Sequence, residues 1–328
     1  GMRGVVFAPS STPENRFHVV PREMPTEMVA EIIASASESA RRYAEAGYDG
    51  VELMASHGLL FAQFLNPRVN RRQDIYGGSA ENRLRPLRES LIGVRRAVGD
   101  GIVVGLRISA DEADEGGLDQ ETVLGICRQL SEEGLVDYVN TTLGTMASLG
   151  GSIHVVPPME IPTAYVAAKA AAIRASVSVP VFVAGRINQP QIAESVLAAG
   201  EADMCGMTRA LIADPDMPRK AREGRSDEIR ACIGCNQACI GHFHAGNSIS
   251  CIQNPSTGRE LRLPAAALAA VRSLKVLVAG GGPAGMKAAV TAAEMGHKVI
   301  LSEAAPRLGG QALLAQLLPD RLEFGGLV

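Results

Sequence analysis

The chain has 328 residues, of which 46% are hydrophobic and 20% charged, and its formal net charge is -3. This length buries a core large enough for one large domain or two. The nearly neutral charge argues against nucleic acid or an anionic membrane surface as a partner, and no apolar run reaches the length of a membrane span. Six cysteines and the absence of an opening signal segment predict a cytoplasmic protein.

The first third of the chain contains one irregular segment and one long helix. Four prolines predict that residues 3–25 form a surface loop. Thr26 is expected to cap a helix that runs to about Ala46, with apolar residues on one face and Gly47 at its end.

Short apolar strand patterns then alternate with helix patterns. The expected strands cover residues 48–53, 102–108, 136–141, 179–184 and 202–207. The expected helices cover residues 79–98, 119–133, 163–175, 190–199 and 215–223. Pro86 is expected to kink the first of these helices or to delay its start. The alternation predicts a parallel sheet, either in an open doubly wound fold or in part of a (β/α)8 barrel.

The residues that follow the strands favour the barrel, whose chemistry lies at the carboxyl ends of its strands. Polar groups gather there, namely His57, Arg107, Thr141-Thr142, Gly185-Arg186 and Thr208-Arg209. A barrel binds phosphate with the loops after its last two strands. Glycine and arginine suit that role, because glycine admits the phosphate to the backbone and arginine donates several hydrogen bonds.

Four cysteines have the spacing of a metal centre. Cys232, Cys235 and Cys239 lie within eight residues, and Cys251 follows after eleven more. Thiols this close in sequence make poor disulfide partners. A tight run of three with a remote fourth is typical of a four-iron cluster. The histidines in the intervening loop, His242 and His244, keep zinc open as an alternative.

A second nucleotide signal follows the cysteines. Residues 275–279 have a strand pattern, and Gly280, Gly282 and Gly285 open the following helix. Glu303 closes the next strand, eighteen residues after Gly285. This is the dinucleotide fingerprint in the context it requires, with a pyrophosphate at the helix N-terminus and an acid for the ribose hydroxyls.

Taken together, the motifs resemble the Old Yellow Enzyme-like NADH:flavin oxidoreductases. The resemblance is strongest to their iron–sulfur branch, which includes 2,4-dienoyl-CoA reductase and trimethylamine dehydrogenase. The motifs that carry it are Tyr48-Asp-Gly-Val-Glu, Gln63-Phe-Leu-Asn-Pro67, Tyr76-Gly-Gly-Ser-Ala-Glu-Asn-Arg83, Gly105-Leu-Arg-Ile-Ser109, Gly185-Arg186, Ala202-Asp-Met through Asp214-Pro215, and the cysteine run. They extend from about residue 21 to residue 310.

The resemblance implies three cofactors. These are FMN in a barrel, a [4Fe-4S] cluster on Cys232, Cys235, Cys239 and Cys251, and FAD or another ADP-type nucleotide, including NAD(P)H, at the fingerprint. Arg107 would lie at the flavin pyrimidine edge. The FMN phosphate would be held by Gly185, Arg186, Gly206, Thr208 and Arg209. The implied domains are a partial FMN barrel over residues 1–225, a cluster segment over 226–265 and a partial nucleotide-binding domain over 270–328.

The sequence departs from the family pattern at its ends. It shows only the last five barrel strands and a single βαβ unit of the nucleotide domain. We therefore expect a chain truncated at both ends, which holds FMN weakly or not at all because the first strands would seal the flavin ring.

The second departure lies in the active site. The family carries two hydrogen-bonding residues after the first of these strands and then a proton-donating tyrosine, where this chain has Met54, His57 and Leu59. His57 is then the candidate catalytic residue. The missing tyrosine favours oxidation of a small N-methylated amine, with reduction of a dienoyl or enoyl thioester, or a non-catalytic electron carrier, as alternatives. An electron-acceptor protein and a second copy of the chain are candidate partners.

Overall fold

The computed structural model describes residues 5–14, 16, 18–263 and 269–328. The chain divides into two compact units. The first comprises residues 1–157, 163–187 and 191–206, and the second comprises residues 158–162, 188–190 and 207–328. None of the helices in the described part has the length and apolarity that crossing a membrane requires.

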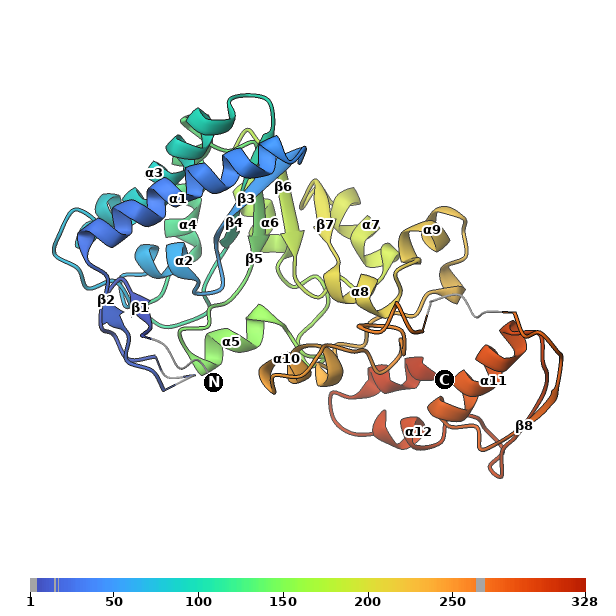
Figure 1. Ribbon diagram of the computed structural model, residues 1–328. Coiled ribbons are helices and arrows are strands. Elements are labelled where there is room, and N and C mark those ends of the chain that lie inside the picture. Colours follow the sequence, from blue (N-terminus) through green and yellow to red (C-terminus); the bar gives the residue numbers. More distant parts are fainter. Residues whose placement is uncertain (1–4, 15, 17, 264–268) are drawn as a thin grey trace. The chain divides into compact units, whose positions relative to one another are not determined.

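A parallel sheet of five strands forms the centre of the first unit (Figure 1). Its strands are β3 (Gly50–Ala55), β4 (Val103–Ser109), β5 (Tyr138–Thr142), β6 (Val181–Ala184) and β7 (Met204–Gly206). They lie in chain order, and a helix connects each to the next. This is the arrangement of consecutive strands in a (β/α)8 barrel, so the prediction of a partial barrel of five strands is confirmed.

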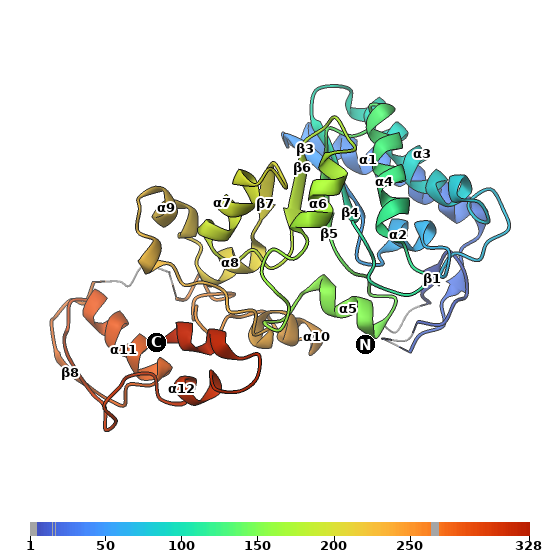
Figure 2. The same ribbon diagram turned by 180° about the vertical axis from the view of Figure 1, so that it is seen from behind.

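The strands alternate between a buried apolar face and a more polar one. Val104, Leu106, Ile108, Val139 and Val183 are fully buried. Five helices lie along the outer side of the curved sheet, as Figure 2 shows for α4 and α6. They are α1 (Thr26–Glu45), α3 (Ala80–Val98), α4 (Gln120–Glu132), α6 (Ala167–Arg174) and α7 (Pro190–Ala198). Because side chains alternate along a strand, the residues between these valines and leucines point to the opposite face.

The expectation of an irregular loop over residues 3–25 is wrong in part. Strands β1 (Phe7–Ala8) and β2 (Arg22–Glu23) pair in parallel. The buried guanidinium of Arg72 holds the residues that follow the two strands. It donates to the carbonyl oxygens of Pro9, at 3.0 Å, and Met24, at 2.6 Å, and pairs with Asp74.

Two expectations concern helix starts, and the first of them is wrong. Pro25, not Thr26, occupies the N-cap of α1, and the Thr26 hydroxyl donates instead to Asp74 Oδ2 at 2.9 Å. Helix α3 begins at Ala80 and includes Pro86, so the proline does not delay it. The N-cap of α3 is Ser79, whose side chain accepts from the Asn82 N–H.

Two short helices at the carboxyl ends of the first unit's strands were not expected. They are α2 (Leu60–Leu65), after β3, and α5 (Leu149–Val155), after β5. Helix α6 begins four residues later than predicted, because Ala164 adopts a left-handed conformation and donates its N–H to the Arg186 carbonyl at 3.2 Å. These loops hold the side chains of the candidate site.

The second unit begins with α8 (Thr208–Ala213), which was not expected, and α9 (Met217–Arg222). A 3-10 turn (Ser226–Glu228), the cysteine segment with a π turn (Gln237–Gly241), and α10 (His242–His244) follow. Residues 269–328 of this unit contain β8 (Lys275–Ala279), α11 (Pro283–Glu294), β9 (Lys298–Ser302), α12 (Gln311–Ala315) and a final 3-10 helix (Leu322–Leu327). Strands β8 and β9 pair in parallel, as a βαβ unit requires.

Candidate active site and cofactor sites

His57 lies directly after β3 in a tightly held backbone. Its φ is +60°, its N–H donates to Ser109 Oγ at 3.1 Å, and its carbonyl accepts from the Met146 N–H at 3.0 Å. It also forms a parallel bridge with Thr145. A side chain at Gly58 would come within 2.6 Å of Thr145 Oγ1, so only glycine fits next to the histidine. The loops after β3, β4 and β5 therefore fix His57 together.

The imidazole of His57 is neutral over most of the physiological pH range. Burial, together with the nearby positive charge of Arg107, lowers its pKa to about 4. Its Nδ1 atom is buried and makes no hydrogen bond to the described residues. A neutral imidazole with an unsatisfied nitrogen suits the binding of a polar ligand group, whereas it holds no acidic imidazolium proton at pH 7.

Arg107 points to the polar face of the sheet and is held by a carboxylate. Its Nε donates to Glu52 Oε1 at 2.7 Å, and the other oxygen of Glu52 accepts from Tyr138, at 3.0 Å, and from Asn140 Nδ2, at 2.9 Å. Burial, with the neighbouring Glu52, raises the pKa of Tyr138 to about 12. Three adjacent strands thus build one network of charged and polar groups.

A glycine makes room for this network. Gly105 is the register partner of both Glu52 and Tyr138. A Cβ on Gly105 would lie 2.0 Å from the Tyr138 ring, so the ring occupies the space of the missing side chain. The same ring stacks on Phe182 at 4.5 Å between centroids.

The position of the expected proton donor is apolar. Leu59 forms the N-cap of α2 and is 38% exposed, so a side chain is accessible there but carries no proton to transfer. Two other candidates contact each other on the connection after β5. The rings of His154 and Tyr165 lie 5.7 Å apart, and the Tyr165 hydroxyl donates to the His154 carbonyl at 3.1 Å.

The expected phosphate ligands have packing roles of their own. A Cβ at Gly185 would lie 2.3 Å from Val166 Cγ2, and Gly206 lies against Ala184. Arg186 is buried in a left-handed conformation. Thr208 and Arg209 begin α8, in the second unit, where Arg209 donates to Asn236 Oδ1 at 2.8 Å. Binding of phosphate by these five residues stays a prediction.

All four clustered cysteines line one open pocket in the second unit, together with Arg209, Ile212, Ile233 and Gln253 among others. None of them is in a disulfide. The Gly234 N–H donates to Cys232 Sγ at 3.5 Å and the Gln253 N–H to Cys251 Sγ at 3.4 Å. Burial raises the pKa of the Cys232 and Cys235 thiols. These thiols therefore need a bound cation to become thiolates near neutral pH.

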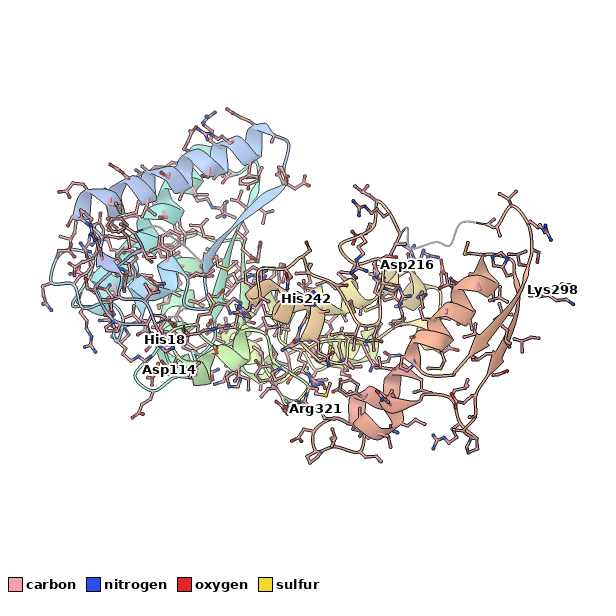
Figure 3. All side chains as sticks on the ribbon, turned by 60° about the horizontal axis from the view of Figure 1, so that its bottom comes forward. His18, Asp114, Asp216, His242, Lys298 and Arg321 are labelled. Atoms are coloured by element: carbon pink, nitrogen blue, oxygen red, sulfur yellow. The ribbon has the colours of Figure 1, made fainter. Side chains whose placement is uncertain are left out.

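The two loop histidines are not placed as zinc ligands. His242, labelled on α10 in Figure 3, directs Nδ1 to the Ser248 carbonyl at 3.1 Å. Among the described residues, no three His, Cys, Asp or Glu side chains are close enough to share a single metal ion. A structural zinc ion needs four ligand atoms at about 2.0–2.3 Å.

The glycine fingerprint has the backbone that a pyrophosphate needs. Gly280 has a φ of +107°, and a Cβ on Gly285 would lie 1.9 Å from the Gly280 carbonyl oxygen. A Cβ on Gly282, at the N-cap of α11, would meet nothing within 4 Å. Glu303 accepts from the Gly281 N–H at 2.6 Å, so here its carboxylate holds the glycine loop.

Comparison with known proteins agrees with this arrangement. The NADH:flavin oxidoreductase / NADH oxidase family matches residues 6–228. The chain belongs to this family. Residues 275–322 of this NADH:flavin oxidoreductase match a second family, the FAD dependent oxidoreductases. Both parts of the chain therefore match families of flavin-dependent oxidoreductases.

Three relatives illustrate the range of the family. NADH oxidase of Thermoanaerobacter brockii is 41% identical over 97% of this chain and 48% of its own length. N,N-dimethylglycine/sarcosine dehydrogenase of Chromohalobacter salexigens is 40% identical over 98% of this chain and 46% of its own. The solved complex of 2-naphthoyl-CoA reductase with 2-naphthoyl-CoA has a TM-score of 0.92 and 33% identity, over 98% of this chain and 48% of the other. This member thus spans about half the length of the curated relatives it matches.

Three residues of the site in this NADH:flavin oxidoreductase were missed from sequence. Glu52 lies in the motif Tyr48-Asp-Gly-Val-Glu. It is two residues from Met54 along a strand, so both side chains point to the same face, and this spacing could have identified Glu52 as a site residue. Glu112 lies in an acidic stretch that is typical of a solvated loop, although it is only 1% exposed. Thr145, fully buried, gave no signal.

Proposed function

We propose that the chain is the flavin-binding and electron-transferring part of a dehydrogenase for small N-methylated amines. The carrying observation is that Leu59, and not a tyrosine, occupies the position of the expected proton donor after β3. Leu59 has no acidic proton, and the imidazole, with a pKa of about 4, has none to give at neutral pH. Reduction of an alkene requires a proton for carbon, whereas removal of a hydride from the C–H next to an amine nitrogen does not.

Bound FMN would supply the hydride acceptor. The residues that would hold it in the first unit are Arg107 at the ring and Gly185, Arg186 and Gly206 at the phosphate. Two buried atoms without hydrogen-bond partners in the described part of the chain, His57 Nδ1 and Asn140 Oδ1, support a polar ligand at this end of the sheet.

The residues of the chain would have distinct tasks in the reaction. The neutral His57 imidazole would accept a hydrogen bond from the N–H of a secondary amine that binds in its uncharged form, after its ammonium proton has passed to water, and would orient its methyl group. Arg107 would stabilise the negative charge that hydride transfer brings to the site, and Glu52 would keep Arg107 in place. The substrate loses a hydride with two electrons and becomes an iminium ion, and water then releases the methyl carbon as formaldehyde.

The cysteine cavity supports a [4Fe-4S] cluster on Cys232, Cys235, Cys239 and Cys251. Four thiols line one space, and two of them accept backbone N–H groups. A cluster gives each thiolate its own iron and passes electrons one at a time. The glycine fingerprint would bind FAD or another ADP-type nucleotide, including NAD(P)H.

The likeness to 2-naphthoyl-CoA reductase favours a second candidate, the NAD(P)H-dependent reduction of a dienoyl or enoyl thioester. In that reaction the proton for carbon would come from water. A cytoplasmic location, an electron-acceptor protein and a second copy of the chain as partners belong to the same proposal.

Substrate-dependent bleaching separates the two reactions. Protein that comprises this chain is purified without oxygen, supplied with FMN and mixed with sarcosine or dimethylglycine. Loss of the flavin absorbance with release of formaldehyde supports amine oxidation. Bleaching by NADH with recovery on adding 2-naphthoyl-CoA, but none by either amine, contradicts it in favour of the reductase. Iron without any flavin binding would indicate an electron carrier if the same result is obtained with a longer protein that also contains the first barrel strands.

A further inference from the structure

Glu112 is a buried acid that the proposed reaction does not use. It lies in the loop after β4, two residues before Asp114, which is labelled in Figure 3. Its side chain is 1% exposed, and one carboxyl oxygen, Oε2, accepts from Asn66 Nδ2 at 2.6 Å and from the Leu118 N–H at 2.9 Å. A carboxyl group in such a place lowers the stability of the folded protein, because burial disfavours its charged form.

The surroundings of Glu112 are shaped by glycines. A Cβ on Gly117 would lie 2.9 Å from Glu112 Oε2. A Cβ on Gly151, at the start of α5, would lie 2.6 Å from Thr145 Cγ2 and 3.0 Å from the Glu112 carbonyl oxygen. Larger residues at either position would displace the carboxyl group or the threonine.

Thr145 connects this acid to His57. Thr145 is a neighbour of the Glu112 carboxyl and favours its ionised form, although no hydrogen bond of normal geometry joins the two side chains. The backbone of Thr145 bridges that of His57, and Gly58 brings the two loops so close that a Cβ there would lie 2.6 Å from Thr145 Oγ1. The next residue, Met146, donates its N–H to the His57 carbonyl at 3.0 Å. A shift of Thr145 therefore moves the backbone that carries the imidazole.

We propose that Glu112 is a positioning residue for His57 and acts through the Thr145 hydroxyl. The importance of His57 itself rests on the proposed function. The coupling between the two residues rests only on the contacts above.

The carboxyl group changes charge near neutral pH. Burial is the main cause that raises the pKa of Glu112 to about 7, and the negative charge of Asp114 adds to it. Asp114 is itself paired with Arg68 at 2.8 Å, and Asn66, Thr145 and Leu118 present only neutral groups. Oxygen Oε1 makes no hydrogen bond of normal geometry to the described residues. On ionisation this oxygen would attract the Thr145 hydroxyl proton, and the threonine would reorient.

The experiment follows the His57 ring by NMR while pH changes from 5.5 to 8.5. The chain has six histidines, and the His57→Gln spectrum assigns the signal. Since the pKa of His57 is lowered to about 4, a step near pH 7 reports a neighbouring group. We expect that step in the parent protein and in Glu115→Gln, an exposed acid of the same loop, and its loss in Glu112→Gln. The absence of a step in the parent, or the same step in all three proteins, overturns the proposal.

A second pair of variants decides the question if Glu112→Gln does not fold. Thr145→Ser keeps the hydroxyl and should keep the step, whereas Thr145→Val has nearly the same shape and should lose at least half of its amplitude. Equal steps in these two variants contradict the route through the hydroxyl. The measurements need neither flavin nor turnover. A protein that fails to oxidise amines can therefore still show the coupling, and an active one can lack it.

Discussion

Glu52 and Arg107 lie side by side on β3 and β4, with 2.7 Å between Glu52 Oε1 and Arg107 Nε. The arginine at the candidate flavin site is therefore not an isolated positive charge. It is held by a carboxylate that also accepts from Tyr138 and Asn140. The position of the guanidinium thus depends on three neighbouring strands, and it is set before any ligand binds.

Glu52→Gln should lower the free energy of unfolding by about 1 kcal/mol. A hydrogen bond to a charged group contributes about 1.5–3 kcal/mol, and the remaining exposure of the pair, 32% for Arg107 and 20% for Glu52, weakens it through solvent screening. Urea unfolding of the two proteins measures the difference. Glu31→Gln, on the exposed side of α1, is the control and should match the parent. Equal midpoints for all three proteins would mean that the ion pair adds nothing to stability.

Cys235→Ser should remove the bound iron and the broad visible absorbance of anaerobically prepared protein. A serine hydroxyl does not replace a thiolate as a ligand of a four-iron cluster. Cys205→Ser is the matched control, because Cys205 lies in β7 and does not line the cavity. Iron and zinc are quantified in each protein. Stoichiometric zinc without iron in the parent contradicts the cluster.

Gly282→Val should abolish binding of ADP to the nucleotide-binding part and leave its fold intact. The new side chain enters open space, since a Cβ at this position meets nothing within 4 Å, and that space is where the pyrophosphate must approach. Gly285→Val should instead unfold the βαβ unit, because its Cβ would lie 1.9 Å from the Gly280 carbonyl. Circular dichroism and ADP titration distinguish the two effects. Equal ADP affinity in Gly282→Val and the parent would refute the assignment.

The stability of the first unit should depend on pH through two opposing groups. The raised pKa of Glu112, about 7, means that its stabilising effect is complete below its ordinary value of 4.5 and is lost as pH rises to 7. The lowered pKa of His57, about 4, means that its effect is complete above 6.5 and is lost as pH falls to 4.

As pH rises from 5 to 8, the parent should therefore lose stability that Glu112→Gln keeps. The difference in free energy of unfolding should shift in favour of the variant by on the order of 3 kcal/mol. As pH falls from 6.5 to 4.5, the free energy of unfolding of His57→Gln should rise relative to that of the parent. Thermal unfolding at several pH values tests both variants. A constant difference between Glu112→Gln and the parent across this range would show that the carboxyl group does not titrate there.

Much of the fold could be predicted from sequence, because parallel strands that are covered by helices leave short apolar runs. All five strands of the sheet were placed within two residues of their observed ends. The short helices α2, α5 and α8 could not be predicted, since they follow strands directly and are held by tertiary contacts. The contacts that hold Pro9 and Met24 come from Arg72, a residue much later in the chain whose charge predicts exposure rather than burial.

The candidate site was only partly predictable. Residues that follow strands, such as His57, were found because the ends of parallel strands meet at one edge. The partners that set their chemistry were not, because neither the pairing of Glu52 with Arg107 nor the burial of Glu112 leaves a periodic pattern. The lowered pKa of His57 likewise arises from its surroundings and not from its place in the sequence.

The fit of the Tyr138 ring over Gly105 restricts the order in which this site can change. Any side chain at position 105 collides with the ring, so that position stays closed to substitution until residue 138 has become small. A small residue at position 138 in turn removes one of the donors to Glu52. A selection experiment that varies one position at a time would therefore find neither change, whereas a library that varies both together would reach a differently shaped surface at the candidate site.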